Sequence, residues 1–425
     1  MHSPICDYLN QVLQQCHGPI QGQLADYIPE LAQADPQQLA LALATIDGSV
    51  YSTGDDDVEF TIQSMSKPFA YAYSLQALGF DAVLAKVGVE PSGEAFNQIS
   101  LDDDNTPKNP MINSGAITIH SLLPKTGSCR AETLRQFLSQ LAGRELSFDE
   151  QVYQSELKTA FRNLSIGYML RSVEVLEQDP VEVVEGYIRQ CAIQVTVKDL
   201  ARMSSVLANG GVHPHTGEQI LSRQVVRQVL SVMMSCGMYD AAGDWLTTVG
   251  IPAKSGVAGG IIGVLPAQVG IAVFSPPLDE HGNSVRGIDI FERLSADMGL
   301  HLMEGSATAQ TIIQRHYRLQ EPVPMVVYEL RGALQFAEAE RLLRALEAET
   351  VNHEPIVFDL NDISLIHAVG SNMLLEAMDR LIQDGHEVII IDAEQILTAK
   401  NTHQGTPLKV YAALEHYLQT LKSPS

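Results

Sequence analysis

The order of extended and helical segments constrains the fold of this chain more than any other feature. Residues 39–46 form an almost continuous apolar run, Asp47-Gly48 gives a two-residue turn signal, and residues 50–52 and 58–62 follow as extended segments. This pattern predicts an antiparallel hairpin near the start of the chain.

A helical region separates this hairpin from a second strand-rich region. The pattern between Leu101 and His213 is mostly helical, with polar loops and proline breaks. Residues 257–264 and 269–274 then form two apolar runs on either side of a short turn. We therefore expect an α+β fold in which strands from both regions pair into one antiparallel sheet with the helices packed on it.

The composition changes again near residues 305–322, which are polar and irregular. At 425 residues the chain can form two or three domains. We assign residues 1–305 to a first domain, 306–322 to a linker and 323–425 to a small α/β domain with at least partly parallel strands. In that last domain strands are predicted at 325–330, 356–360 and 388–391, and helices at 336–349, 371–383 and 407–421.

Ser64 and Lys67 place a hydroxyl and an amine three residues apart at the predicted start of a helix that ends at Gly79. Residues at this spacing share one helix face, so Ser64 can contact Lys67 while Ser66 points elsewhere. A neutral lysine could take the serine proton, provided that its pKa is lowered well below the usual value. The pair alone also fits an N-cap serine followed by a solvated lysine.

A second short motif is the companion of the first. Lys254-Ser255-Gly256 opens the predicted strand 257–264. In penicillin-recognising serine enzymes, a Lys-Thr-Gly or Lys-Ser-Gly box lies on a strand beside the Ser-x-x-Lys helix. Alone it would be an ordinary corner between a loop and a strand; together, in this order, the two motifs predict a serine enzyme.

Bulk properties argue against several other classes. The net charge of −24 disfavours binding to nucleic acid or to anionic lipid. The five cysteines include no C-x-x-C pair, and the first residues carry no secretory leader, which predicts reduced thiols and a cytoplasmic protein. No apolar run is long enough to cross a membrane. His213 and His215 lack metal-ligand spacing and are predicted to be surface residues, and no phosphate-binding glycine loop occurs, so neither a metal nor a cofactor is expected.

Roughly residues 5–300 resemble the serine-dependent, β-lactamase-related glutaminases. The similarity rests on the segment FTIQSMSKPFAYAYSLQALG and on further runs in the same order, namely YIPELA, NPMINSGAI, YQSE, RNLSIGY, LANGGVHPHTGE, SCGMYD, PAKSGVAGGI and SPPLDEHGNSVRG. The absence of an evident S-D-N box and the reading Lys-Ser-Gly separate the chain from the β-lactamases. The resemblance implies a β-lactamase/transpeptidase-like antiparallel sheet with a helical region.

The resemblance also implies a mechanism and a set of site residues. Ser64 would attack the side-chain amide of L-glutamine, Lys67 would take its proton, and a γ-glutamyl ester would then be hydrolysed to glutamate. The backbone N–H groups of Ser64 and Val257 would form the oxyanion hole, and we expect the glycines around Val257 to permit close backbone approach. Tyr239 would pass a proton to the departing ammonia, with Tyr27 nearby.

Glutamine carries an ammonium and a carboxylate, and a selective site has to pair both. By resemblance Glu156 would hold the ammonium, while Asn113, Asn163 and Tyr187 would hold the carboxylate and neighbouring polar atoms. Gln63, beside the nucleophile, would shape the pocket.

Residues from about 323 onward resemble a STAS domain, through the stretch IVFDLNDISLIHAVGSNMLLEAMDRLIQDGHEVIIIDA. In the anti-sigma-factor antagonists that share this fold, a phosphorylatable serine precedes the glycine at the start of the helix; Val369 occupies that position here. The resemblance implies a regulatory or docking module whose ligand or partner the sequence does not identify.

Two alternatives remain open at this point. One is an enzyme acting on β-lactams or D-peptides, and the other is a glutamine-sensing signalling protein without turnover. The family resemblance also implies a homo-oligomer, dimeric or tetrameric. The sequence fixes neither the oligomeric state, nor activation by effectors, nor the preference between glutamine and asparagine.

Overall fold

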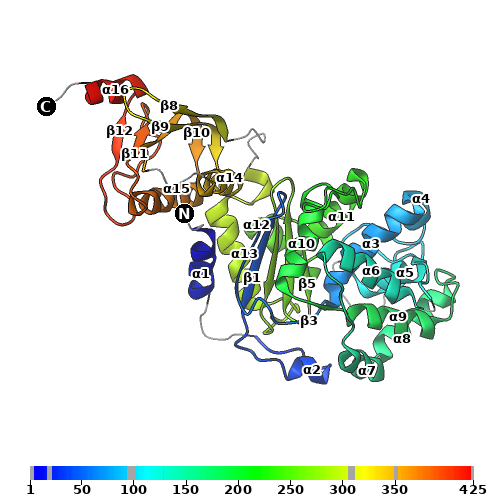
Figure 1. The fold of residues 1–425 in the computed structure, drawn as a ribbon. Helices are drawn as coiled ribbons and strands as arrows, with labels where there is room; N and C mark the ends of the chain where they lie inside the picture. Colours follow the sequence, from blue (N-terminus) through cyan, green and yellow to red (C-terminus); the bar gives the residue numbers. More distant parts are fainter. Residues whose placement is uncertain are drawn as a thin grey trace. The chain divides into compact units, whose positions relative to one another are not determined.

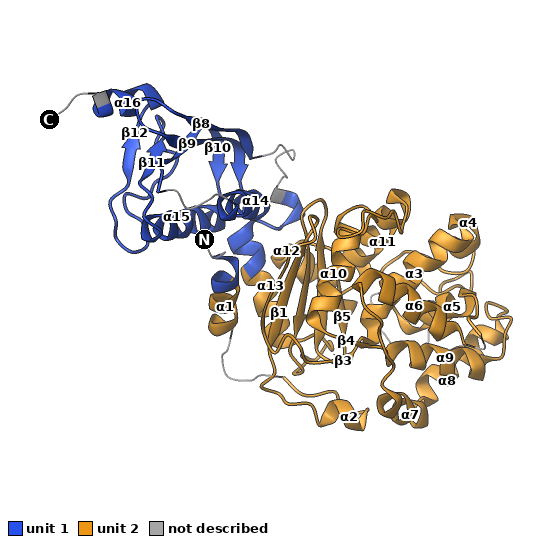
Figure 2. Cartoon of the chain, in the orientation of Figure 1, with its two compact units in different colours: residues 1–8, 294–425 blue, residues 9–293 orange. Residues whose placement is uncertain are grey.

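A computed structural model describes residues 4–16, 22–92, 101–127, 129–304, 312–348 and 353–422. The chain forms two compact units (Figure 2): residues 9–293 make one, and residues 1–8 with 294–425 make the other. Each combines helices with a five-stranded sheet, which confirms the predicted α+β class (Figure 1). No helix in the described part of the chain is long and apolar enough to span a membrane.

The sheet of residues 9–293 is entirely antiparallel, in the order β2-β1-β7-β6-β5. The predicted hairpin forms its first two strands, with Ala42 opposite Ser52, and the late strands complete it, with Ala42 also opposite Ala272. Strands from the two ends of this unit therefore meet in one sheet, as the sequence predicts. The bounds are β1 Ala40–Thr45, β2 Val50–Gly54, β5 Ala253–Gly256, β6 Gly260–Leu265 and β7 Val269–Phe274.

Helices cover both faces of this sheet. Gly270 on β7 leaves room for α10, since a Cβ there would lie 2.3 Å from the Ser205 nitrogen. On β6, Gly263 leaves room for the Phe291 ring of α13 in the same way, at 2.5 Å. Gly263 pairs with Ile271, the neighbour of Gly270, so the two glycines belong to opposite faces. Strands buried on both faces read as continuous apolar runs, which explains the pattern of β1.

The helical region packs beside the sheet and carries most of the site (Figure 1). Two apolar clusters hold it together, one around α3, α6, α10 and α11 and one around α8 and α9. The helices of residues 9–293, including two that cross its boundaries, are α1 Ile5–Gln15, α2 Pro29–Ala32, α3 Ser66–Leu78, α4 Phe80–Leu84, α5 Asn113–Leu122, α6 Arg130–Ala142, α7 Glu150–Lys158, α8 Phe161–Ser172, α9 Pro180–Cys191, α10 Val197–Ala208, α11 Arg223–Cys236, α12 Ala242–Thr248 and α13 Val285–Met298. The 3₁₀ turns η1 Gln63–Met65 and η2 Tyr239–Ala241 lie in this unit, and η3 Leu302–Glu304 follows it.

Two strand predictions in this unit are wrong in detail. The predicted strand 58–62 shortens to β3, Phe60–Thr61, which pairs with β4, Gln194–Val195, outside the main sheet. Lys254-Ser255-Gly256 does not open a strand running through 257–264: it lies on β5, and residues 257–259 form the turn to β6. The left-handed φ of +101° at Gly259 produces that turn.

The sheet of the C-terminal unit has the order β12-β11-β10-β9-β8. Its strands are parallel except for β8, which pairs antiparallel with β9 and lies within the segment predicted to be a linker. The predicted helix 407–421 is instead a short strand followed by a helix. The bounds are β8 Ile313–Leu319, β9 Met325–Leu334, α14 Phe336–Glu347, β10 Ile356–Ile366, α15 Ala368–Gln383, β11 Val388–Ile391, β12 Lys409–Tyr411 and α16 Leu414–Lys422.

Candidate active site

Ser64 lies in a tight turn that precedes its helix. It occupies the middle of η1, and α3 begins two residues later at Ser66, so the expectation that the helix starts at the serine is wrong by these two residues. Gln63 has a left-handed φ of +48°, which non-glycine residues seldom adopt. Such strain persists only where the surroundings hold it, and it marks this turn as a functional candidate.

Three buried polar side chains hold the turn from behind. The Ser66 hydroxyl donates to the Gln63 carbonyl at 2.8 Å and accepts from Gln190 Nε2 at 3.0 Å. Gln190 Oε1 is 2.8 Å from His120 Nδ1, whose pKa burial lowers to about 4, so the ring is neutral and Nδ1–H is the donor. Ser66 thus points away from Lys67, as expected. No motif or spacing singles out His120 or Gln190, which come from α5 and α9.

Lys67 is fully buried beside the nucleophile turn. Its Nζ donates to the Met111 carbonyl at 3.1 Å and to Asn113 Oδ1 at 2.8 Å. Burial lowers the pKa of Lys67 to about 8, although Cys191 and Glu156 act in the opposite direction. The amine is therefore available in its neutral form at mildly alkaline pH.

A second buried lysine flanks the site on β5. Lys254 Nζ donates to the Ser255 carbonyl at 2.7 Å and lies 3.9 Å from the centre of the Tyr239 ring. Burial, with a smaller effect of the Lys67 charge, lowers the pKa of Lys254 well below its usual value. The Tyr239 hydroxyl donates to the same carbonyl at 3.1 Å and also has the Ser64 side chain as a hydrogen-bond partner.

The glycines near Val257 let neighbouring segments approach closely. A Cβ at Gly260 would lie 2.3 Å from Met65 Cε, and one at Gly259 would lie 2.4 Å from the Ser275 carbonyl oxygen. The turn after β5 can therefore approach both the nucleophile turn and the segment after β7. Val257 itself is nearly buried at the tip of this turn.

A pocket of about 240 Å³ opens onto Ser64. Of the predicted site residues, Lys67 and Tyr239 are not among its lining residues. Tyr27 is 46% exposed, so it forms part of the rim. The lining brings together the predicted residues Tyr27, Gln63, Ser64, Asn113, Glu156, Asn163, Tyr187 and Val257, and adds the unpredicted Thr159, Ala160, Arg162 and Cys191.

Glu156 supplies a buried carboxylate to this pocket. Burial raises its pKa to about 7, while a hydrogen bond from Gln63 and the charge of Lys67 act to lower it. Its Oε2 atom is buried and has no hydrogen-bond partner among the described residues. An unpartnered buried carboxylate oxygen that lines a cavity is suited to a cationic group of a ligand.

Asn113 connects Lys67 to the polar side chains that line the pocket. Its Oδ1 accepts from Lys67 Nζ and, at 3.3 Å, from the Tyr187 hydroxyl, and its Nδ2 donates to Asn163 Oδ1 at 2.9 Å. Burial raises the pKa of Tyr187 well above its usual value, so its hydroxyl stays protonated. These contacts place Asn113, Asn163 and Tyr187 in one network.

Comparisons with known proteins agree with this geometry. The glutaminase family model matches residues 22–303 and the STAS domain model matches residues 316–403. A glutaminase of Corynebacterium glutamicum is 49% identical over 409 residues, which are 96% of this chain and 98% of that protein.

Solved structures give the same result. Mglu in its glutamate form is 44% identical with a TM-score of 0.71, over 93% of this chain and all of that chain. A probable glutaminase from Bacillus subtilis complexed with 6-diazo-5-oxo-L-norleucine is 33% identical with a TM-score of 0.63, over 70% of this chain and 94% of that chain. The chain belongs to the glutaminase family of enzymes and carries a C-terminal STAS domain.

Proposed function

We propose that this enzyme hydrolyses L-glutamine to L-glutamate and ammonia through a γ-glutamyl ester on Ser64, with Lys67 as the general base. The observation that carries the proposal is one small pocket lined both by Ser64, in its strained turn, and by the buried, unpartnered Glu156 oxygen, with the buried Lys67 of lowered pKa following that turn on α3. The relatives described as holding glutamate and 6-diazo-5-oxo-L-norleucine support a glutamine-like ligand.

The hydrogen bonds of Lys67 favour its role as a base. A neutral amine has two N–H groups and one lone pair, and two acceptors, the Met111 carbonyl and Asn113 Oδ1, lie at hydrogen-bond distance from Nζ. With both N–H groups donated to these acceptors, the lone pair is the group through which the amine takes a proton. A protonated Lys67 would instead have to keep a full positive charge in a buried site.

In the acylation step, Ser64 Oγ bonds to the side-chain amide carbon and its proton passes to Lys67. The carbonyl oxygen becomes an oxyanion, for which the backbone N–H groups of Ser64 and Val257 are the proposed donors. Tyr239, a hydrogen-bond partner of Ser64, transfers a proton to the amide nitrogen as the C–N bond breaks and ammonia leaves. Tyr239 recovers its proton from Lys67.

In the deacylation step, water attacks the ester carbon and gives its proton to neutral Lys67. The ester C–O bond then breaks, Ser64 regains a proton and L-glutamate leaves. Both steps use the same base and the same oxyanion donors, so one arrangement of residues serves the whole cycle.

Substrate selection follows from the two charges of glutamine. Glu156 pairs with the α-ammonium, which gives its unpartnered oxygen a donor. Asn113, Asn163 and Tyr187 bind the α-carboxylate side, Gln63 orients Glu156, and Tyr27 closes the rim. A β-lactam or D-peptide substrate would leave Glu156 without a cationic partner, which argues against that alternative.

We further propose that residues 1–305 act as the catalytic domain and residues 323–425 as a regulatory STAS module with its own ligand or partner. A homo-oligomer stays a prediction from the family resemblance, which light scattering of the purified protein would test, and a cytoplasmic location stays a prediction from the sequence.

The test is the release of ammonia and glutamate from L-glutamine by the purified protein beside Ser64→Ala and Lys67→Ala. We expect release by the parent chain and only background from both variants, since loss of either member of a nucleophile and base pair removes most of catalysis. Release by Ser64→Ala at the parent rate would disprove the mechanism.

A further inference from the structure

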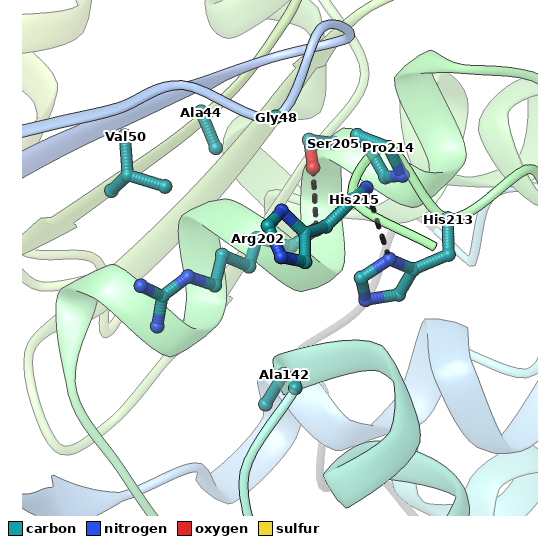
Figure 3. A pocket seen from close by; sticks show the side chains of 10 residues that line it. Ala44, Gly48, Val50, Ala142, Arg202, Ser205, His213, Pro214 and His215 are labelled. Carbon is teal, nitrogen blue, oxygen red and sulfur yellow. Dashed lines mark hydrogen bonds between the residues drawn. The ribbon is translucent and has the colours of Figure 1, made fainter. Parts of the chain in front are cut away.

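A second cavity lies within residues 9–293 and shares no lining residue with the Ser64 pocket. Its volume is about 380 Å³. Figure 3 shows that the β1–β2 hairpin closes one side, with Ala44 and Val50, and that Ala142 at the end of α6 closes another. Arg202 of α10 and the loop that carries His213 and His215 complete the lining.

The loop that carries the two histidines is held in place by its own hydrogen bonds. His213 donates its backbone N–H to the Glu218 carbonyl at 2.8 Å and accepts at its own carbonyl from Gly217 at 2.9 Å. Its Nδ1 accepts from the backbone N–H groups of His215 and Thr216, at 3.2 Å each. The cavity is therefore formed before any ligand enters. The prediction that both histidines lie at the surface is wrong for His213, which is only 7% exposed.

The cavity is lined by one arginine and two histidines and by no acidic residue, in a chain whose net charge is −24. Burial lowers the pKa of His213, and the charges of His215 and Arg202 lower it further against an opposing effect of Glu218. His213 is thus neutral at pH 7 and, with Nδ1 accepting, carries its N–H at Nε2. Among the described residues, the Arg202 guanidinium has no ion-pair partner.

Most of the remaining lining is apolar; the Ser205 hydroxyl, the exception, donates to the Arg202 carbonyl at 2.7 Å. Ala44, Val50, Ala142 and Pro214 contribute side chains without polar atoms, and the volume falls in the range of small-molecule sites and far exceeds that of a single inorganic ion. A guanidinium matches a carboxylate through two parallel hydrogen bonds.

We propose that this cavity binds a small organic anion, with its carboxylate on Arg202 and an apolar body against Ala44, Val50 and Ala142. His213 Nε2–H and His215 are further donors to the carboxylate. The site is separate from the chemistry at Ser64 and does not depend on the mechanism proposed above.

The experiment is titration calorimetry of the full chain with phenylacetate, beside its neutral analogue phenylacetamide and beside acetate and inorganic phosphate. Three variants are compared: Arg202→Gln in the cavity, Arg162→Gln in the Ser64 pocket and Arg227→Gln on the surface of α11. We expect phenylacetate to bind and Arg202→Gln to weaken it by about tenfold to a hundredfold, as for a lost charge-assisted hydrogen bond. The amide should bind more weakly by a similar factor, and the other two variants should match the parent.

Each remaining outcome overturns the proposal or one of its parts. Absence of phenylacetate binding at millimolar concentration, or equal binding by Arg202→Gln, would refute the site. Loss of binding in Arg162→Gln alone would place the anion in the Ser64 pocket. If acetate or phosphate binds as tightly as phenylacetate, the apolar part of the ligand adds nothing to binding, and that part of the proposal is refuted.

Discussion

Replacing Glu156 by glutamine should make the protein more stable at alkaline pH and at the same time weaken glutamine binding. The folded protein raises the pKa of Glu156 from 4.5 to about 7, mainly by burial. Between these two values the folded chain binds more protons than the unfolded chain, so Glu156 lowers the free energy of unfolding as pH rises through this window. A glutamine side chain at position 156 resembles the protonated carboxyl, so the Glu156→Gln variant does not lose stability as pH rises through this window.

The size of the effect follows from the pKa difference. A shift from 4.5 to about 7 corresponds to about 3 kcal/mol between the ionised and protonated forms of this nearly buried side chain. Urea unfolding at a series of pH values should therefore show no difference between Glu156→Gln and the parent below pH 4.5. The variant should gain about 3 kcal/mol by pH 8. Its KM for glutamine should rise by about tenfold to a hundredfold, because the ammonium loses a charged acceptor.

A matched control lies on the same helix. Glu150 is a surface residue of α7 whose ion pair with Arg189, at 3.3 Å, is exposed to solvent. Glu150→Gln should change the stability by less than about 1 kcal/mol and leave KM unaltered. The reasoning fails if Glu156→Gln is not more stable than the parent at pH 8, or if its stability gain is the same at every pH.

Four further predictions follow from the structure. The ratio kcat/KM should rise with pH as Lys67 loses its proton, with half of the rise reached near pH 8 and a plateau about one unit above, and a profile that is flat between pH 6 and pH 9 would contradict its role as a base. Ser66→Ala removes the hydrogen bond to the Gln63 carbonyl and should lower kcat about tenfold with KM nearly unchanged; a rise in KM alone would show that the turn does not orient the nucleophile. Gly270→Ala should lower the free energy of unfolding by about 2 kcal/mol, measured by urea denaturation, because its Cβ would meet the α10 backbone; unchanged stability would contradict the packing of α10 on β7. A chain ended after residue 304 keeps α13 and should retain glutaminase activity, and its complete loss would show that the catalytic unit needs the STAS domain.

Local patterns predicted the hairpin, the late strands and the strand Val388–Ile391, because their apolar runs and turn signals are contiguous in the sequence. The spacing of Ser64 and Lys67 likewise suggested the nucleophile and base that we propose. Strand β8 was not predicted because all its residues are exposed or half-buried, so no apolar run marks it in the sequence. Its strand conformation depends on the antiparallel pairing with β9.

The parts of the site that the sequence could not provide depend on contacts between distant segments. The left-handed φ of Gln63 and the support of its turn by Gln190 and His120 arise only when three elements meet. The same holds for the lowered pKa of Lys67, which the sequence left unexplained. Burial, which no local pattern reports, is the largest cause of its lowered pKa.

The central claim is that Ser64 carries a γ-glutamyl ester during turnover. Rapid acid quenching of the parent enzyme with L-glutamine, followed by digestion and mass spectrometry, tests it directly. We predict a γ-glutamyl group on Ser64 in the parent chain and none anywhere in Ser64→Ala. An unmodified Ser64 during steady turnover of the parent chain, or the γ-glutamyl group on a different residue, would contradict the account.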